Sequence, residues 1–257
     1  MKKSILILLI FILPYIIYAD EKKSQVGIDE KLGEYVPGDI TFFDEFGKTV
    51  QLKDLMNGKP VIITLVYFRC PGICSPLLTS LAKNVDMLDL EIGKDYSIIT
   101  ISFDTSEDYV MAAEKKKNYF NTLKVKKPGT NDWRFLTADS VNVARITDAV
   151  GFRFIKQGND FIHSGVLTVL SPDGKIVRYL YGNEFLPFDL KLALIEASEG
   201  RVGSTISKVV KLCYSYDVEG RKYMLNVTRI AGAGILFILG TFAGVLIFAK
   251  KRNKKNN

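Results

Sequence analysis

Two short segments of strand-forming residues, the first of them nearly all apolar, most constrain the fold of this chain. Residues 60–68 (PVIITLVYF) and 96–103 (YSIITISF) are rich in β-branched residues and short, so both predict buried strands rather than helices. Between them, apolar residues from Leu77 to Leu88 recur at helical spacing, which predicts a helix from Pro71 to about Leu90. A strand–helix–strand order of this kind is typical of α/β domains.

The other expected elements extend this pattern. They are a hairpin within TFFDEFGKTVQL with its turn at 44–47, a helix over 106–123, a short strand at WRFLT, a helix capped by Asp139 and ending at Gly151, a hairpin of 165–170 with 175–181 around the turn 171–174, and a last helix over 187–197. Together they predict a mixed-sheet α/β domain with a thioredoxin-like fold, an added N-terminal β-hairpin and an inserted helix.

Both ends of the chain carry membrane or targeting signals. Residues 1–19 combine a basic start, an apolar core and a small residue at a cleavage point, which predicts a signal peptide, with an uncleaved anchor as the alternative. Residues 230–248 are uncharged and long enough to cross the hydrocarbon core, so they predict a transmembrane helix. The basic tail, 249–257, places the C-terminus in the cytoplasm and the soluble part on the periplasmic side of the cytoplasmic membrane.

One soluble domain is expected between these ends. The predicted boundaries are a flexible lead at 20–35, a thioredoxin-like domain at 36–199 and a juxtamembrane extension at 200–229. The net charge is +7, but Lys2, Lys3 and the basic residues of the tail account for all of it. The part between them is neutral overall, which indicates membrane topology and argues against a nucleic-acid partner.

Cys70 and Cys74 lie where the first buried strand meets the following helix. The free N–H groups and positive dipole end of a helix N-terminus favour thiolate over thiol. With three residues between them, the two sulfurs can form a disulfide or hold one soft metal ion. A plain disulfide staple or a pair of inert buried thiols is the structural alternative, although such a small loop gives a staple little entropic stabilisation.

His163 is the only histidine in the chain, and it directly precedes the strand expected at 165–170. On a thioredoxin-like topology this loop faces the N-terminus of the cysteine-bearing helix. Two thiolates and one imidazole suit copper, whereas zinc would usually require a fourth ligand. Asp160 is a candidate acceptor for the imidazole N–H, with the capping of a turn as its alternative role.

Cys213 is the third cysteine, in KLCYSYDVEG ahead of the predicted membrane span. A free or partly buried thiol is the simpler interpretation. An intermolecular disulfide or a contribution to copper handling is the other.

The motifs V-Y-F-R-C-P-G-I-C-S-P, S-F-D and D-F-I-H-S, which contain Cys70, Cys74, Asp104 and His163, resemble the SCO/SenC family over about residues 35–197. Members of this family are copper-binding, thioredoxin-fold assembly factors for cytochrome c oxidase. The resemblance implies copper ligation by Cys70, Cys74 and His163. It also implies delivery of copper to, or reduction of cysteines in, the binuclear copper site of oxidase subunit II.

Three features depart from the family pattern. Residues 104–108 (DTSED) stand where typical members have D-P-x-x-D-T, Ile162 stands where many have an aspartate before the histidine, and the stronger membrane span is C-terminal. The ligands are retained, but the partner and the balance between metal and redox chemistry stay open. A metallochaperone is therefore the primary hypothesis. An enzyme, a thiol-disulfide reductase with Cys70 and Cys74 as its redox pair, is the alternative. A peroxidase is a third hypothesis, but this chain lacks the Pro-x-x-x-Thr-x-x-Cys surroundings expected of peroxiredoxin-like proteins.

Overall fold

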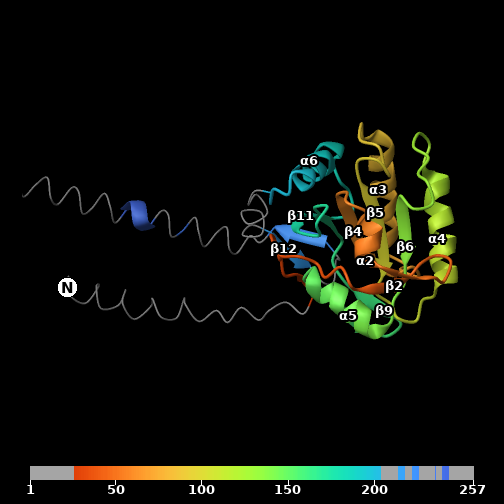
Figure 1. The fold of residues 1–257 in the computed structure, drawn as a ribbon. Coiled ribbons are helices and arrows are strands. Elements are labelled where there is room, and N and C mark those ends of the chain that lie inside the picture. The colour runs from red at the N-terminus through yellow and green to blue at the C-terminus, as the bar shows by residue number, and fades with distance from the viewer. Residues whose placement is uncertain (1–25, 204–213, 218–221, 226–234, 236–238, 243–257) are drawn as a thin grey trace, which may run out of the picture.

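The computed structural model describes residues 26–203, 214–217, 222–225, 235 and 239–242 (Figure 1). Its centre is a five-stranded sheet in the order β11-β10-β4-β5-β6. Strands β4 (Val61–Val66), β5 (Ser97–Ser102) and β6 (Trp133–Leu136) are parallel. Strand β10 (Val166–Leu170) runs antiparallel to both β4 and β11 (Ile176–Tyr181). The mixed sheet confirms the predicted α/β class.

The two segments of strand-forming residues form the middle of this sheet. Every residue of β4 and β5 is buried, so both buried strands are confirmed. Helix α3 (Cys74–Met87) connects β4 to β5, and α4 (Tyr109–Thr122) connects β5 to β6, because parallel neighbours need a crossover. Helix α3 also packs against α4 and against α6 (Pro187–Ser198). The first residue of α3 therefore lies at the carboxyl end of β4.

The predicted hairpins and the helix cap are also confirmed. Strands β2 (Thr41–Phe43) and β3 (Thr49–Gln51) pair around a turn in which Gly47 adopts a φ of +77°, a value that suits glycine. The turn between β10 and β11 is closed by the N–H of Gly174, which donates to the Ser171 carbonyl at 2.9 Å. Helix α5 (Ser140–Ala149) begins after Asp139, whose carboxylate accepts the N–H of Asn142.

Several short elements were not predicted. They are α2 (Leu52–Met56), a pair of β1 (Gly27–Ile28) with β7 (Phe152–Arg153), a hairpin of β8 (Ile155–Gln157) with β9 (Asp160–Ile162), and a pair of β12 (Tyr214–Asp217) with β13 (Lys222–Leu225). The β8–β9 hairpin is the most important of these for function, because His163 follows it directly.

Residues 26–35 pack onto the domain, in contrast to the flexible lead expected over 20–35. Val26 is buried. The N–H of Asp29 donates to the Gly151 carbonyl at 2.8 Å, and the N–H of Gly33 donates to the Ile176 carbonyl at 2.8 Å. The folded unit therefore includes residues ahead of the predicted boundary at 36.

Other sequence predictions fall outside the described residues. These are the signal peptide at 1–19, Cys213, the tail at 249–257 and most of the predicted span at 230–248. Within the part of the chain that the structure describes, no helix combines the length and the apolar character needed to cross a membrane.

Candidate metal and dithiol site

Three side chains of types that can ligate a metal ion converge at the carboxyl end of β4. Cys70 lies in the loop after β4, Cys74 is the first residue of α3, and His163 lies between β9 and β10. One ligand atom from each lies within 4.8 Å of the other two, and the Cys74 sulfur is 3.3 Å from Nε2 of His163. All three residues are buried, and both thiols are free. The structure thus brings the histidine to the cysteines across a long sequence separation.

The two cysteines are chemically inequivalent. The pKa of Cys70 is lowered to about 3, mainly by a hydrogen bond from the Cys74 thiol. Burial opposes this shift, whereas His163 and the amides of Cys74 and Gly72 add to it. The N–H of Gly72 lies 3.4 Å from the Cys70 sulfur. Burial, and next the proximity of Cys70, raises the pKa of Cys74 well above its usual range. At neutral pH the pair therefore holds one thiolate and one thiol.

Aromatic rings surround His163. The ring centroids of Phe103, Tyr67 and Phe152 lie 5.1, 5.8 and 5.9 Å from the centroid of its imidazole. Its Nδ1 lies 3.1 Å from the carbonyl oxygen of Ser164. The carbonyl can only accept, so Nδ1 donates to it, and Nε2 is the ring nitrogen that is left to ligate a metal ion.

Asp160 contacts the cysteine-bearing loop. Its Oδ1 accepts a hydrogen bond from the hydroxyl of Tyr67 at 3.4 Å. Asp160 belongs to β9, whereas Tyr67 directly follows β4. The sequence pointed to this carboxylate as a partner of the imidazole, and the structure shows it linking the histidine-bearing hairpin to the cysteine-bearing loop.

Glu107 is a residue of this region to which the sequence analysis assigned no role. Its side chain is fully buried. The carboxylate accepts hydrogen bonds from the N–H groups of Phe68 and Arg69, at 2.6 and 2.7 Å, and from the Ser102 hydroxyl at 2.6 Å. These contacts fix the start of the loop that contains Cys70. The sequence offers one signal for Glu107: an acidic residue shortly after the second buried strand, whose carboxyl end lies beside that of the first.

Arg69 forms the exposed rim of the site. Its half-exposed guanidinium donates to Oδ2 of Asp104 at 3.0 Å and lies 3.4 Å from Oε1 of Glu107. Burial acts to raise the pKa of Asp104, but hydrogen bonds from Ser106 and Arg69 outweigh it, and the pKa lies below its usual value. A positive charge paired with two carboxylates therefore stands next to Cys70.

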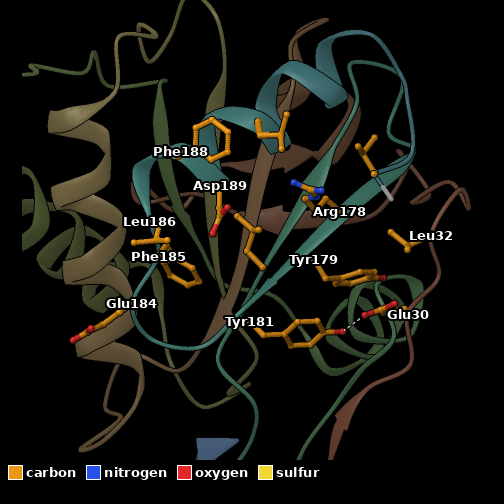
Figure 2. A pocket seen from close by; sticks show the side chains of 14 residues that line it. Glu30, Leu32, Arg178, Tyr179, Tyr181, Glu184, Phe185, Leu186, Phe188 and Asp189 are labelled. Carbon is orange, nitrogen blue, oxygen red and sulfur yellow. Dashed lines mark hydrogen bonds between the residues drawn. The ribbon is translucent and has the colours of Figure 1, made fainter. Parts of the chain in front are cut away.

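A separate groove crosses the outer side of β11 (Figure 2). It has a volume of about 510 Å³ and is lined by side chains of β11, of α6 and of the segment around Glu30. Leu32, Phe185 and Phe188 form part of its apolar lining, and the hydroxyl of Tyr181 donates to the Glu30 carboxylate. No member of the Cys-Cys-His cluster lines this groove, so the two features are distinct.

The sheet order and the three converging side chains define a thioredoxin-like domain with a cysteine–cysteine–histidine site. The model of the SCO1/SenC family matches residues 29–189, and the chain belongs to this family.

Known proteins agree with this assignment. A SCO1 protein homolog of Bacillus subtilis (strain 168) is 27% identical over 158 residues, which cover 58% of this chain and 76% of that protein. The crystal structure of a putative electron transfer protein from Aquifex aeolicus VF5 is 36% identical with a TM-score of 0.60, and the match covers 66% of this chain and 96% of that chain. The crystal structure of Arabidopsis thaliana ScoI with copper bound shares the fold, at 20% identity and a TM-score of 0.52, with coverage of 64% and 99%.

Proposed function

We propose that this protein binds copper through Cys70, Cys74 and His163 and acts in the assembly of the binuclear copper centre of cytochrome c oxidase. The convergence of two sulfurs and one imidazole nitrogen within 4.8 Å carries the proposal. Soft thiolates with an imidazole suit copper better than they suit hard cations. Membership of the SCO1/SenC family and the copper held by ScoI of Arabidopsis thaliana support the same metal.

The residues around the three ligands prepare them for copper. Cys70 is a thiolate at neutral pH, so it needs no proton loss before it binds a metal ion. Cys74 is protonated, so copper binding releases its proton. The Ser164 carbonyl orients the imidazole of His163. Bound copper would be the cargo, passed to the copper site of oxidase subunit II as the family resemblance implies.

The test is a copper titration of the reduced full-length protein in detergent, followed by visible absorption. We expect about one copper ion per chain and thiolate-to-Cu(II) charge-transfer bands. The bands should be lost in Cys70→Ala, Cys74→Ala and His163→Ala. Cys213→Ala is the matched control, expected to retain both stoichiometry and bands. A reduced wild-type protein that binds no copper would rule out the proposal, and loss of the bands in Cys213→Ala would require a different ligand set.

Membrane attachment is the second part of the proposal. We infer a single-pass protein with its domain on the periplasmic side and its C-terminus in the cytoplasm, supported by the uncharged stretch 230–248 and the basic tail after it. This arrangement would keep the site beside a membrane-embedded oxidase. A C-terminal tag should then resist protease added to spheroplasts, while the domain is digested. Digestion of the tag in intact spheroplasts would contradict this topology.

A thiol-disulfide reductase is the second candidate, favoured by the inequivalence of the two cysteines. The Cys70 thiolate would attack a partner's disulfide, forming a mixed disulfide and releasing one partner thiol. Cys74 would then lose its proton and attack the Cys70 sulfur, releasing the second partner thiol and leaving a Cys70–Cys74 disulfide. The two functions separate at His163. Oxidase assembly that survives His163→Ala, but not either cysteine change, would favour the reductase.

A further inference from the structure

We propose that the groove across the outer side of β11 is a docking site for a partner protein, whose bound segment carries lysine or arginine among apolar side chains. This inference goes beyond the proposed function, because no member of the Cys-Cys-His cluster lines the groove. It assigns an interaction surface and the chemistry of the partner that fits it.

The charge of the groove is negative. Its lining includes three carboxylates, Glu30, Glu184 and Asp189, and one cation, Arg178. Nε of Arg178 lies 3.2 Å from Oε2 of Glu196, which is not part of the lining, so the charge of the arginine is already balanced. Glu184 and Asp189 form no ion pair with the residues that the structure describes. A cationic side chain in the groove would therefore meet carboxylates that are not yet neutralised.

The rest of the lining is apolar or aromatic, apart from Gly203. Figure 2 shows Tyr179 and Tyr181 of β11 between Glu30 on one side of the groove and Phe185 on the other. The volume of about 510 Å³ is comparable to that of sites that enclose a drug-sized ligand, so it can take a few side chains. Apolar side chains of the bound segment would displace water from this lining.

Two large apolar side chains at the rim favour a protein over a small molecule. Phe188 is 71% exposed and Leu186 is 67% exposed, and both line the groove. A small molecule inside the groove would leave the outer faces of these side chains in water, whereas a protein surface covers them.

The carboxylates disfavour two other occupants. A bilayer with anionic lipids would bring negative headgroups against Glu184 and Asp189. A second copy of the chain, docked through the same groove, would bring these carboxylates against their own equivalents. A basic segment of a different protein meets neither repulsion.

One wall of the groove is fixed to the helix that begins with Cys74. The N–H of Phe185 donates to the hydroxyl of Ser80 at 3.1 Å, and the side-chain amide of Asn84 donates to the Phe185 carbonyl at 3.0 Å. Ser80 and Asn84 both belong to α3. A partner held in the groove would therefore have a defined position relative to this cysteine.

The same wall continues to the metal and dithiol site. Asn183, directly before Glu184, packs against Gly165: an added Cβ on this glycine would lie 2.5 Å from Oδ1 of Asn183 and 3.1 Å from Cδ1 of Ile73. Gly165 lies two residues after the histidine of the site, and Ile73 directly precedes one of its cysteines. One short segment thus borders both the groove and the site.

The experiment places a photocrosslinking side chain in the groove of the full-length protein in its native cells. Phe188→p-benzoylphenylalanine keeps an aromatic ring at the rim. Phe46→p-benzoylphenylalanine is the matched control, because Phe46 is 69% exposed but does not line the groove. After irradiation, mass spectrometry identifies the crosslinked segment. From position 188, but not from position 46, we expect a segment of another protein with lysine or arginine among apolar residues.

Removal of charge tests how the segment is recognised. Glu184→Gln combined with Asp189→Asn keeps the shape of the groove, and it should lower the crosslink yield about fivefold, the effect of losing two exposed ion pairs. Glu114→Gln combined with Asp54→Asn makes the same change at exposed acids outside the groove and should leave the yield unchanged. An unchanged yield in the groove variant, or a captured segment without a basic residue, would overturn the proposal.

Other occupants would reveal themselves by the identity of the crosslink. A crosslink to residues 204–213 of the same chain, to a second copy or to lipid would each contradict a partner protein. So would the lack of any crosslink both from position 188 and from a second probe, Leu186→p-benzoylphenylalanine. Circular dichroism checks that each variant is folded.

The crosslink needs no copper, so it is independent of the test of the proposed function. A parent protein that binds no copper would reject the proposed function and leave the crosslink result standing. The groove variant should bind copper like the parent, because neither of its carboxylates belongs to the Cys-Cys-His cluster. Loss of copper binding in this variant would place the two carboxylates in the metal site and contradict their role in docking.

Discussion

The two halves of the site are held in place by different forces. The cysteine-bearing loop depends on one buried carboxylate, Glu107, which accepts three hydrogen bonds from Phe68, Arg69 and Ser102. The histidine depends on rings, the nearest being Phe103 at 5.1 Å. The loop leaves β4 with backbone donors that no strand pairs, whereas His163 follows the β8–β9 hairpin and is enclosed by rings from other elements.

This difference implies two kinds of sensitivity. Hydrogen bonds to a carboxylate are short and directional, so they define the position of the loop through a few atoms. Ring contacts are individually weak and act together, so they shape the space in which the imidazole packs and do not fix single atoms. Loss of the carboxylate should therefore disturb the sulfurs specifically. Loss of a ring should cost more stability overall but affect only the histidine side of the chemistry.

The largest expected effect is on the aromatic side. Phe103 is 1% exposed and its ring contacts that of His163 at 5.1 Å, so Phe103→Ala should lower the free energy of unfolding by about 3–5 kcal/mol through the cavity it creates. Denaturant titration of the full-length protein measures this. Phe46→Ala, at an exposed phenylalanine, is the control and should change the value by less than about 0.5 kcal/mol.

The same variant also tests the separation of the two halves. Phe103→Ala should weaken copper binding while leaving the glutathione equilibrium of Cys70 and Cys74 near the parent value. A shift in that equilibrium as large as the loss of copper affinity would mean that the rings also position the sulfurs.

The next effect is on the polar side. Glu107→Ala leaves two backbone N–H groups and one buried hydroxyl without their acceptor, so it should lower the free energy of unfolding by about 2–3 kcal/mol. It should also shift the equilibrium of Cys70 and Cys74 with glutathione, which Phe103→Ala should leave near the parent value. Glu91→Ala is the matched control, because Glu91 is exposed and pairs only with Lys126 in the ion pairs of the described residues, and its loss should cost under about 1 kcal/mol. Equal losses at the two glutamates would refute the special role of Glu107.

The next prediction concerns how the thiolate of Cys70 responds to pH. Because Cys74 and the surrounding amides lower that pKa to about 3, the thiolate persists as pH falls and disappears only as pH passes through the folded value. The thiolate absorbance of the reduced protein, taken as the difference from Cys70→Ser, should therefore stay nearly constant from pH 7 to about pH 5. A midpoint near the usual cysteine pKa of about 8.5 would contradict this picture.

The cysteine half of the site could be predicted from local sequence. The short β-branched segments that become β4 and β5 favour buried strands over helices, and Cys70 and Cys74 follow the first of them closely. The position of His163 required topology as well, since it depends on which strand lies beside β4. The β8–β9 hairpin that holds it escaped prediction because its strands have three residues each and mixed polarity, with only a short turn at Gly158 and Asn159 as a signal.

The carboxylates were harder to predict for a different reason. Asp160 and Glu107 stand in polar segments where an exposed acid is the usual outcome, and nothing local distinguishes them from their neighbours. Their partners, Tyr67 and the N–H groups after β4, lie far away in sequence. Such contacts depend on how the loops pack against one another at the carboxyl ends of the strands, and composition and periodicity do not predict that packing.

The smallest expected effect separates the backbone of Arg69 from its side chain. The N–H of Arg69 donates to the buried carboxylate of Glu107, whereas its guanidinium is half-exposed and pairs with Asp104 at 3.0 Å. Arg69→Ala keeps the N–H, so it should cost at most about 1 kcal/mol, and the cost should shrink in high salt. Denaturant titration at two salt concentrations measures both. A loss of unfolding free energy as large as that of Glu107→Ala would mean that the ion pair of Arg69 with Asp104 is the stabilising contact. The cysteine half of the site would then be held by surface charge and not by the backbone donors that bind Glu107.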